Sequence, residues 1–270
     1  MHGLLRCAHN WCMPVIRHNE TVDTLLHRRS IRAFADERID EDTIFTLETA
    51  AQHAASSQFL NDWSAIRIED PAIKQALAQI GKQPYIAQAP LLYVFVLDEH
   101  RNAAIAQQQH IDVDSDEFTL NASYRFSQAQ NDGAFALHAM ETAANSLGLG
   151  CVILGSILND IDRVVELLGL PQYTYPLLGL AIGKPAQSPA EKPRMPRSMQ
   201  FFVNQYPQHD EELLEGLQEF DDRVHQYYDL RNTARPVDAF SAQIAKASTD
   251  KEVLGRNFGH AQRQGFELDK

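Results

Sequence analysis

The sequence predicts an α+β fold in which helices flank a central mixed β-sheet. Helix and strand patterns follow one another irregularly, without the β-α-β alternation of a doubly wound parallel sheet. One run, 91–97, is continuously apolar, which indicates a strand buried on both faces. The alanine-rich segment 131–147 is apolar nearly all round, which is typical of a central helix.

Apolar periodicity, capping residues and turn formers place the other elements in chain order. Asp40 is a suitable N-cap for a helix over 41–54, Pro71 suits the first turn of the next helix, and Gly169 ends a later one. The expected helical segments are 21–27, 41–54, 71–80, 85–89, 99–109, 131–147, 160–168, 210–228 and the tail from 238. The expected strands are 65–68, 90–97, 151–154, 175–182 and 200–206, and 110–121 is expected to be a loop or lid.

Composition narrows the classes of function. The 270 residues carry a formal net charge of −12, which argues against sequence-independent nucleic-acid binding and against adhesion to anionic membranes. No apolar run approaches the roughly 18 residues of a membrane span, and Arg6 and His9 interrupt any signal peptide. Three cysteines do not suggest a disulfide framework, so a cytoplasmic location is expected. An anionic ligand would need a local basic pocket.

Both ends of the chain differ in character from its middle. Residues 1–20 lack periodicity and are expected to form an arm. Their histidines and cysteines have no second ligand pair at a suitable spacing, so no metal site is expected. After Gly183, four prolines within twelve residues predict an extended arm.

Three polar clusters are the candidates for a binding site. The first, 28–32, places three arginines and Ser30 within five positions, and guanidinium forks suit phosphate oxygens. A solvated basic turn is the alternative interpretation. The second cluster is Ser56-Ser57-Gln58, followed later by Gln83, and the third is Lys192-Pro-Arg194 on the proline-rich arm. Gly155, just past a strand, could expose its amide to a planar ligand because no Cβ blocks the approach.

The sequence does not match other known catalytic or nucleotide-binding motifs. The Gly148-x-Gly150 pair follows a helix, not a strand, and so does not match a dinucleotide fingerprint. The sequence contains no phosphate-binding P-loop, no Gly-x-Ser-x-Gly elbow and no His-Glu-x-x-His. These motifs therefore identify no side-chain nucleophile or general base.

Five motifs in register resemble the nitroreductase family, and within it the NADPH-dependent nitroreductases and FMN reductases. They are Arg-Arg-Ser-Ile-Arg-Ala-Phe, Ala-Ala-Ser-Ser-Gln-Phe-Leu-Asn, Gln-Pro-Tyr-Ile-Ala-Gln-Ala-Pro, Ser-Leu-Gly-Leu-Gly-Cys-Val-Ile-Leu-Gly-Ser and Lys-Pro-Arg-Met-Pro. The resemblance implies one FMN-binding domain over 21–270, with a sheet of about five strands. It also implies a homodimer with FMN at the interface, in which the arm and helical extension at 184–270 embrace the partner.

The resemblance also assigns roles by position. Arg28, Arg29 and Ser30 would hold the FMN phosphate and ribityl chain, with Lys192 and Arg194 completing the phosphate site. Arg32 would lie near N1 and O2 of the flavin. The remaining contacts would come from Ser56, Ser57 and Gln58 of either subunit, from Gln83 at the pyrimidine edge, and from Ile153, Leu154 and the Gly155 amide against the ring and N5. Arg28 stands where the subgroup commonly has histidine, and Ser156 where it commonly has a second glycine; both would alter the rim of the pocket.

The implied activity is an NADPH-dependent oxidoreductase. NADPH would pass hydride to flavin N5, and a nitroaromatic, a quinone or free flavin would then take the electrons in the same pocket, with Arg32 stabilising the reduced flavin. The alternatives are a flavin reductase serving a partner monooxygenase, a flavin-binding protein without turnover, and a helical interaction protein with solvated arginines. Arg231 and Arg235 are expected to bind the NADPH 2′-phosphate, unless they merely compensate neighbouring aspartates.

Overall fold

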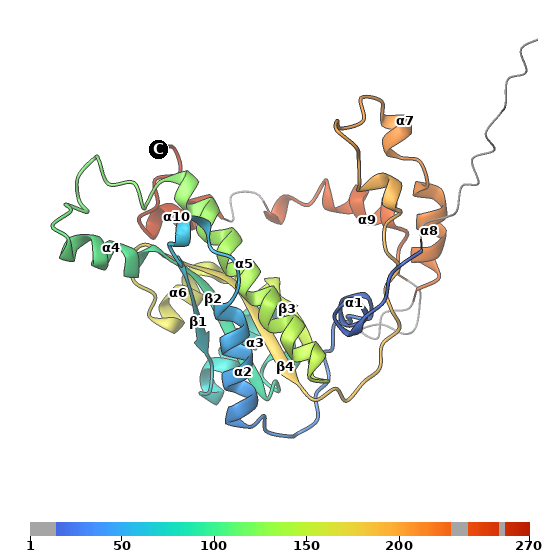
Figure 1. Ribbon diagram of the computed structural model, residues 1–270, viewed down its shortest axis with the longest axis horizontal. Coiled ribbons are helices and arrows are strands. Elements are labelled where there is room, and N and C mark those ends of the chain that lie inside the picture. Colours follow the sequence, from blue (N-terminus) through green and yellow to red (C-terminus); the bar gives the residue numbers. More distant parts are fainter. Residues whose placement is uncertain (1–14, 228–236, 254–256) are drawn as a thin grey trace, which may run out of the picture.

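A computed structural model describes residues 15–227, 237–253 and 257–270, and shows helices packed on both faces of one sheet (Figure 1). The sheet order is β1-β2-β4-β3, and each neighbouring pair is antiparallel. Parallel pairing in the described residues is confined to isolated bridges such as Ser30 with Cys151. The four strands are β1 (Trp63–Arg67), β2 (Leu91–Asp98), β3 (Gly150–Leu154) and β4 (Thr174–Gly183).

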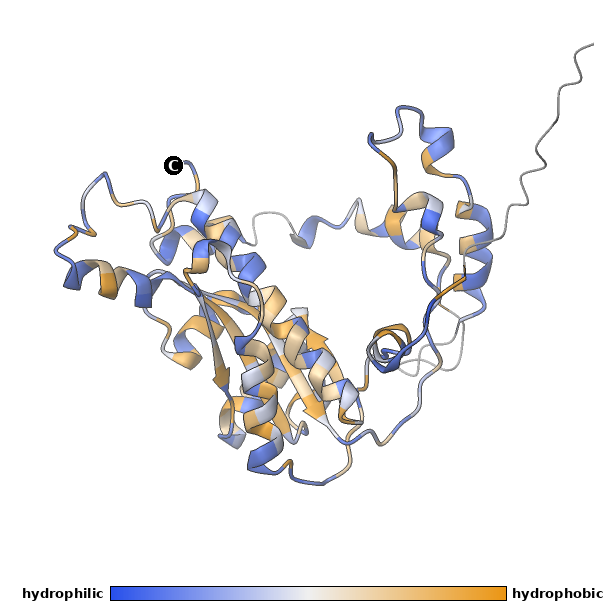
Figure 2. Ribbon diagram, in the orientation of Figure 1, coloured by the Kyte–Doolittle hydropathy of each residue, from blue (hydrophilic) through white to orange (hydrophobic). Residues whose placement is uncertain are grey.

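Strand β2 divides the core because its side chains alternate between two apolar layers. Tyr93 and Phe95 face the layer that α2 and α5 build, whereas Val94 and Val96 face the layer under α3 and α6. Figure 2 shows the hydrophobic colouring concentrated in these central elements. No helix in the described part of the chain is long and apolar enough to cross a membrane.

The helical elements agree closely with the sequence patterns over most of the chain. Asp40 caps α2 by accepting a hydrogen bond from the Thr43 amide at 2.8 Å, and Asp70 caps α3 in the same way through Ala72. The α-helices are α1 (Glu20–Leu26), α2 (Glu41–Gln52), α3 (Pro71–Gly81), α4 (Glu99–Gln108), α5 (Ser123–Ser146), α6 (Ile161–Leu168), α7 (Asp210–Leu213), α8 (Leu217–His225), α9 (Phe240–Ala247) and α10 (Phe258–Arg263). The 3₁₀ turns are η1 (Ser57–Phe59), η2 (Pro84–Ile86), η3 (Gly155–Asp160), η4 (Arg197–Met199) and η5 (Lys251–Val253).

Three sequence-based boundaries were wrong. Helix α5 begins at Ser123, not at residue 131. The amide and hydroxyl of Ser123 both donate to the Lys270 carbonyl oxygen. This contact is distant in sequence, and no local capping residue marks the start of the helix. The helix expected over 210–228 is two helices, because Gly216 between them takes a left-handed φ of 93°. Residues 200–206 form no strand, because their backbone pairs with no strand in the described part of the chain.

The C-terminal third makes a long excursion away from the sheet. After β4 the chain leaves the core, forms the lobe of α7, α8 and α9 beside α1, and returns to α10 on the far side of α5 (Figure 1). Within the lobe, Phe220 of α8 packs against Phe240 of α9 with ring centroids 5.2 Å apart. At the return, Phe266 is buried against Phe126 of α5.

A cluster of three fully buried carboxyl groups lies between α5 and the start of β1. Both oxygens of Asp132 accept from the Ser57 amide, at 3.0 and 2.8 Å, whereas neither oxygen of Asp62 meets a donor among the described residues. Burial, and after it the charges of Asp132 and Glu99, raise the pKa of Asp62 to about 7. Burial likewise raises the pKa of Glu99 to about 7, against a lowering hydrogen bond from Asn102.

These raised pKa values predict a loss of stability as pH rises. The folded state keeps protons that the unfolded chain releases above pH ~4, so the free energy of unfolding should fall between pH ~4 and ~7. Asp62→Asn, which resembles the protonated acid, should remove part of this slope and stabilise the protein at pH 8 by on the order of 2 kcal/mol. Urea unfolding at several pH values measures both.

The matched control is Asp162→Asn. The Asp162 carboxylate is hydrogen-bonded by His260 and then Arg263, which lowers its pKa, so this substitution should cost stability above its pKa. If Asp62→Asn and the unsubstituted protein kept parallel pH profiles, Asp62 would not titrate in the folded state as argued.

Candidate functional site

The basic segment 28–32 is fixed by its contact with the edge of the sheet. The Ile31 amide donates to the Cys151 carbonyl oxygen of β3 at 2.8 Å, and the Ile31 side chain is buried. This close approach requires Gly150, because a Cβ there would lie 2.6 Å from Ile31 Cγ1. With Ile31 turned into the core, the polar side chains around it are left at the surface.

The proline-rich arm runs beside this segment. The Ala35 amide donates to the Lys184 carbonyl oxygen, and the Ala186 amide to the Ala33 carbonyl oxygen, both at 2.9 Å. Phe34 and Pro185 form an antiparallel bridge between them. These bonds satisfy backbone groups that a polyproline-like arm cannot pair internally, and they bring 187–194 next to 28–32.

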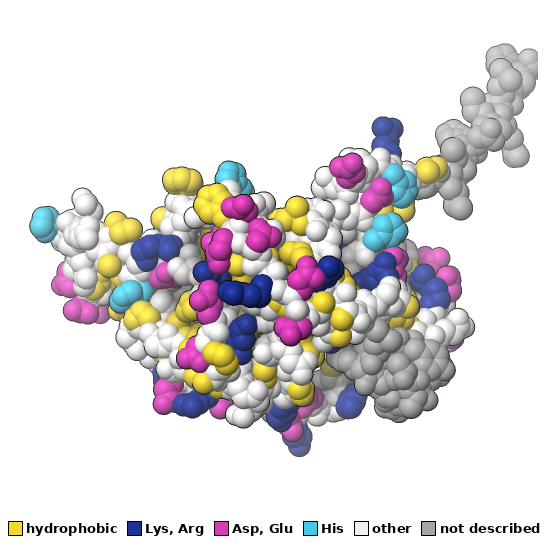
Figure 3. Space-filling view, turned by 90° about the horizontal axis from the view of Figure 1, so that it is seen from below, with side chains coloured by type: hydrophobic (Ala, Val, Ile, Leu, Met, Phe, Trp, Pro, Cys, Tyr) yellow, Lys and Arg dark blue, Asp and Glu magenta, His cyan; other side chains and the backbone are white. Residues whose placement is uncertain are grey.

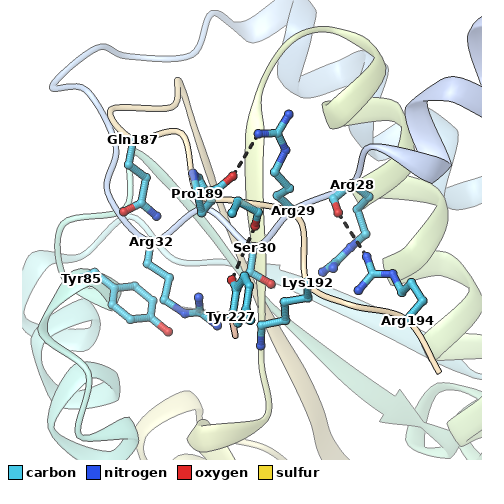
Figure 4. A pocket seen from close by; sticks show the side chains of 11 residues that line it. Arg28, Arg29, Ser30, Arg32, Tyr85, Gln187, Pro189, Lys192, Arg194 and Tyr227 are labelled. Carbon is cyan, nitrogen blue, oxygen red and sulfur yellow. Dashed lines mark hydrogen bonds between the residues drawn. The ribbon is translucent and has the colours of Figure 1, made fainter. Parts of the chain in front are cut away.

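The two segments enclose a cavity of about 210 Å³. Figure 4 shows the Arg32 and Tyr85 side chains directed toward each other on one side, with Lys192 and Arg194 on the other. The lining residues are Arg28, Arg29, Ser30, Arg32, Tyr85, Gln187, Pro189, Ala190, Lys192, Arg194 and Tyr227. Five of these are cationic, in a chain of net charge −12, and on the face seen in Figure 3 basic and acidic side chains are instead interspersed.

Hydrogen bonds between the two segments hold the cations in place. Arg29 Nη1 donates to the Pro189 carbonyl oxygen at 3.0 Å, and Arg194 Nη2 donates to the Arg28 carbonyl oxygen at 3.4 Å. The Arg32 side chain makes no hydrogen bond or ion pair with the described residues. Each guanidinium has five N–H donors, so most of this donor capacity remains for an anion.

Several pocket residues were not predicted. Tyr85 lies inside the Gln-Pro-Tyr motif, in which the resemblance assigns a role only to Gln83; the Tyr85 hydroxyl donates to Gln83 Oε1. Gln187 and Tyr227 come from the arm and from beyond the end of α8, where no sequence pattern marked them. Their place in the pocket depends on tertiary folding.

The other predicted contacts do not line this cavity. Gln83 contacts Tyr85, which does line the cavity. Ser57 and Gln58 lie on η1, with Ser56 directly before it, near the first half of α5, where Gln58 Oε1 accepts from Arg125 Nη1 at 2.9 Å. Arg231 and Arg235 fall outside the described residues.

Gly155 follows β3, four residues after the Cys151 that pairs with Ser30, hence about 13 Å along an extended chain. Ile153 is half-buried and Leu154 buried in β3, and Gly155 itself is exposed. A Cβ on Gly155 would meet nothing closer than Leu178 Cδ2 at 4.0 Å, so the packing of this chain does not require glycine there. Ser156, the departure noted in the sequence, turns its hydroxyl into the core beside Gly81.

The pocket at the edge of this α+β sheet carries cations suited to an anionic group such as a phosphate. Comparison with known proteins gives the class. The model of the nitroreductase family matches residues 25–184, and that of the nitroreductase family C-terminal domain matches 192–269. The chain belongs to the nitroreductase family.

Individual relatives support the same conclusion. The FMN reductase (NADPH) of Bacillus subtilis is 32% identical over 249 residues, covering 92% of this chain and 98% of that protein. The structure of B. megaterium NfrA1 matches with a TM-score of 0.84 at 32% identity, over 92% of this chain and 99% of the other. The NADPH:FMN oxidoreductase from Vibrio harveyi, complexed with NAD+, matches with a TM-score of 0.80 at 29% identity, over 92% and 99%. The chain is therefore an enzyme, an NADPH-dependent oxidoreductase of the FMN reductase type.

The phosphate assignment of the pocket predicts a selective loss of affinity. Arg29→Ala and Arg194→Ala should each weaken FMN binding roughly ten- to a hundredfold, the value of a charge-assisted contact. Riboflavin, which lacks the phosphate, should bind with nearly unchanged affinity. Equilibrium titration with both flavins measures the ratio of FMN affinity to riboflavin affinity. Unchanged FMN affinity in both variants would show that the phosphate does not bind in this pocket.

Proposed function

We propose that FMN binds with its phosphate among the cations of the pocket and its ring system toward Gly155. The observation that carries this proposal is the convergence of Arg29, Arg32, Lys192 and Arg194 from two distant segments of an acidic chain. Such a concentration of positive charge is costly unless an anion binds there.

The residues present fit the cofactor. Guanidinium groups with spare donors, beside the positive charge of Lys192, suit a phosphate, and Gly155 is a glycine that the folded chain does not need for its own packing. Bound FMN supplies the hydride-accepting and hydride-donating chemistry. The chain's contribution is then to hold the phosphate, to limit water access, and to place the positive charge of Arg32 where negative charge develops on reduction.

The acceptor is the finer part of the proposal. We infer that NADPH and the acceptor use the same opening in turn, in a ping-pong sequence, and that the acceptor is a nitroaromatic, a quinone or free flavin. Free flavin is favoured by the names of two relatives, FMN reductase (NADPH) and NADPH:FMN oxidoreductase. If free flavin is the acceptor, the enzyme could supply reduced flavin to a partner monooxygenase.

The absorption spectrum tests the proposal most directly. The purified protein should be yellow, and anaerobic NADPH should bleach it. A colourless protein that takes up no FMN on titration would exclude the FMN site, and a yellow protein that NADPH does not bleach would be a binder without turnover.

We further propose a homodimer in which the flavin site draws on both subunits. Asp132, which holds Ser57, and Glu141, beside Arg28, are nine residues apart on α5. At about 100° and 1.5 Å per residue they lie on opposite faces of the helix and about 14 Å apart along it. One chain thus presents Ser57 and Arg28, the residues that these acids hold, in different directions, and a single flavin could contact both only if they come from different subunits.

Exposed apolar side chains give this dimer its contact surface. The arm carries Phe201, Val203 and Tyr206 at 65%, 83% and 61% exposure, and the core carries Phe45 on α2 and Phe135 on α5 at 70% and 53%. Large side chains of this kind, grouped on an excursion with little contact to its own core, are typical of an interface.

If the arm forms the dimer interface, a charge introduced on it should weaken the dimer. Val203→Asp should weaken the dimer and, with it, FMN retention, because an uncompensated carboxylate would be buried in the interface. Val15→Asp is the matched control, since Val15 has the same residue type and is also 83% exposed. Light scattering decides: equal dimer stability in both variants would contradict an interface at Val203.

The choice of nicotinamide is proposed to depend on Arg231, with Arg235 as a second contact. Arg231→Ala should lower kcat/KM for NADPH roughly ten- to a hundredfold, because NADPH differs from NADH by the 2′-phosphate. The value for NADH should barely change. Equal losses with both cofactors would indicate a general defect in flavin binding. No loss with either cofactor would contradict a role in binding the 2′-phosphate.

A further inference from the structure

A buried carboxylate, that of Glu141, contacts one of the arginines that line the pocket. Glu141 is on α5, where its neighbours Met140 and Ala144 belong to the core, and its own side chain is only 1% exposed. A buried carboxylate without partners would be strongly unfavourable, so the groups that face it determine its role.

Glu141 faces two basic side chains. Its Oε1 accepts from Arg28 Nε at 2.7 Å, and its Oε2 lies 3.2 Å from Nδ1 of His138, which is 57% exposed. The Arg28 side chain is 27% exposed and lines the pocket. Its terminal nitrogens make no hydrogen bond with the described residues, so one edge of the guanidinium is anchored and the other is available.

Arg28 also supports a second cation. Its carbonyl oxygen accepts from Arg194 Nη2 at 3.4 Å, and Figure 4 shows the Arg28 and Arg194 side chains adjacent at the same end of the pocket. Because a guanidinium is planar and rigid, fixing one of its edges fixes the direction of the remaining donors. Glu141 therefore fixes the direction of Arg28 and, through the Arg28 carbonyl oxygen, helps to hold Arg194.

We propose that Glu141 is a positioning residue for the phosphate end of the site: it anchors Arg28 so that the terminal nitrogens of Arg28, together with Arg194, face a phosphate monoester. This rests on the proposed FMN site. Glu141 itself would touch neither the phosphate nor the ring.

Charge and orientation make opposite predictions for the loss of Glu141. A carboxylate beside an anion site repels the anion, so its removal should by charge alone strengthen FMN binding. If Glu141 acts by orienting Arg28, its removal should weaken FMN binding instead, because the freed side chain loses its fixed direction. A weakening therefore cannot be an electrostatic effect.

The test is flavin titration of the full-length protein after dialysis to remove bound flavin. Glu141→Leu, which has no acceptor, should lower the preference for FMN over riboflavin about tenfold, near the lower end of one charge-assisted contact. Glu141→Gln keeps an acceptor oxygen and should lose less. Arg28→Gln should lose at least as much as Glu141→Leu, and adding Glu141→Leu to it should cause no further loss.

Glu166→Leu is the control for net charge, since the Glu166 carboxylate pairs with Arg163 on α6. An unchanged or raised FMN preference in both Glu141 variants would overturn the inference, as would losses that multiply in the double variant. If Glu141→Leu fails to fold, Glu141→Gln alone decides. A wild-type protein without FMN preference would overturn this inference and the FMN site together; loss in Arg194→Ala but in neither Glu141 variant would overturn this inference alone.

Discussion

The contact of Ile31 with Gly150 fixes the geometry of the pocket. It seats one buried side chain of the basic segment against β3, and the Ile31 amide then pairs with Cys151. The arm can add its backbone to residues 33–35 only because that segment already lies along the sheet. Cations separated by more than 150 residues in sequence are thereby brought around one cavity through backbone hydrogen bonds, which depend little on the side chains that they position.

Burial determines how charge is used in this protein. Five cations line one cavity of an acidic chain, and the carboxylate that compensates one of them, Glu141, comes from the core side and not from solvent. A surface partner such as Glu191, which pairs with His27, is partly exposed and its attraction is screened by water. The buried partner is screened less, so it can hold Arg28 in one direction.

Local patterns predicted most elements, but not the contacts that assemble the site. Asp40, Pro71 and the apolar run of β2 act within a few residues, so the sequence predicted them well. The start of α5 depends on Lys270, far away in sequence, and a single positive φ at Gly216 splits one predicted helix into two. The basic segment and the Lys-Pro-Arg motif could be predicted because arginine density is visible in a sequence. Glu141 could not, since a glutamate in a helix looks like a surface residue until its burial is known.

Helix α5 links the two halves of the predicted site. Its buried Asp132 holds the η1 backbone through Ser57, and its buried Glu141, half a turn out of phase, holds Arg28. Each acid costs solvation energy that an apolar residue would not, and each is retained where it fixes a segment that the resemblance assigns to flavin. In a two-fold dimer the η1 face of one α5 and the Arg28 face of the other can meet at one flavin. The long helix would then set the spacing between the two flavin sites, and the exposed arm would keep the two copies in register.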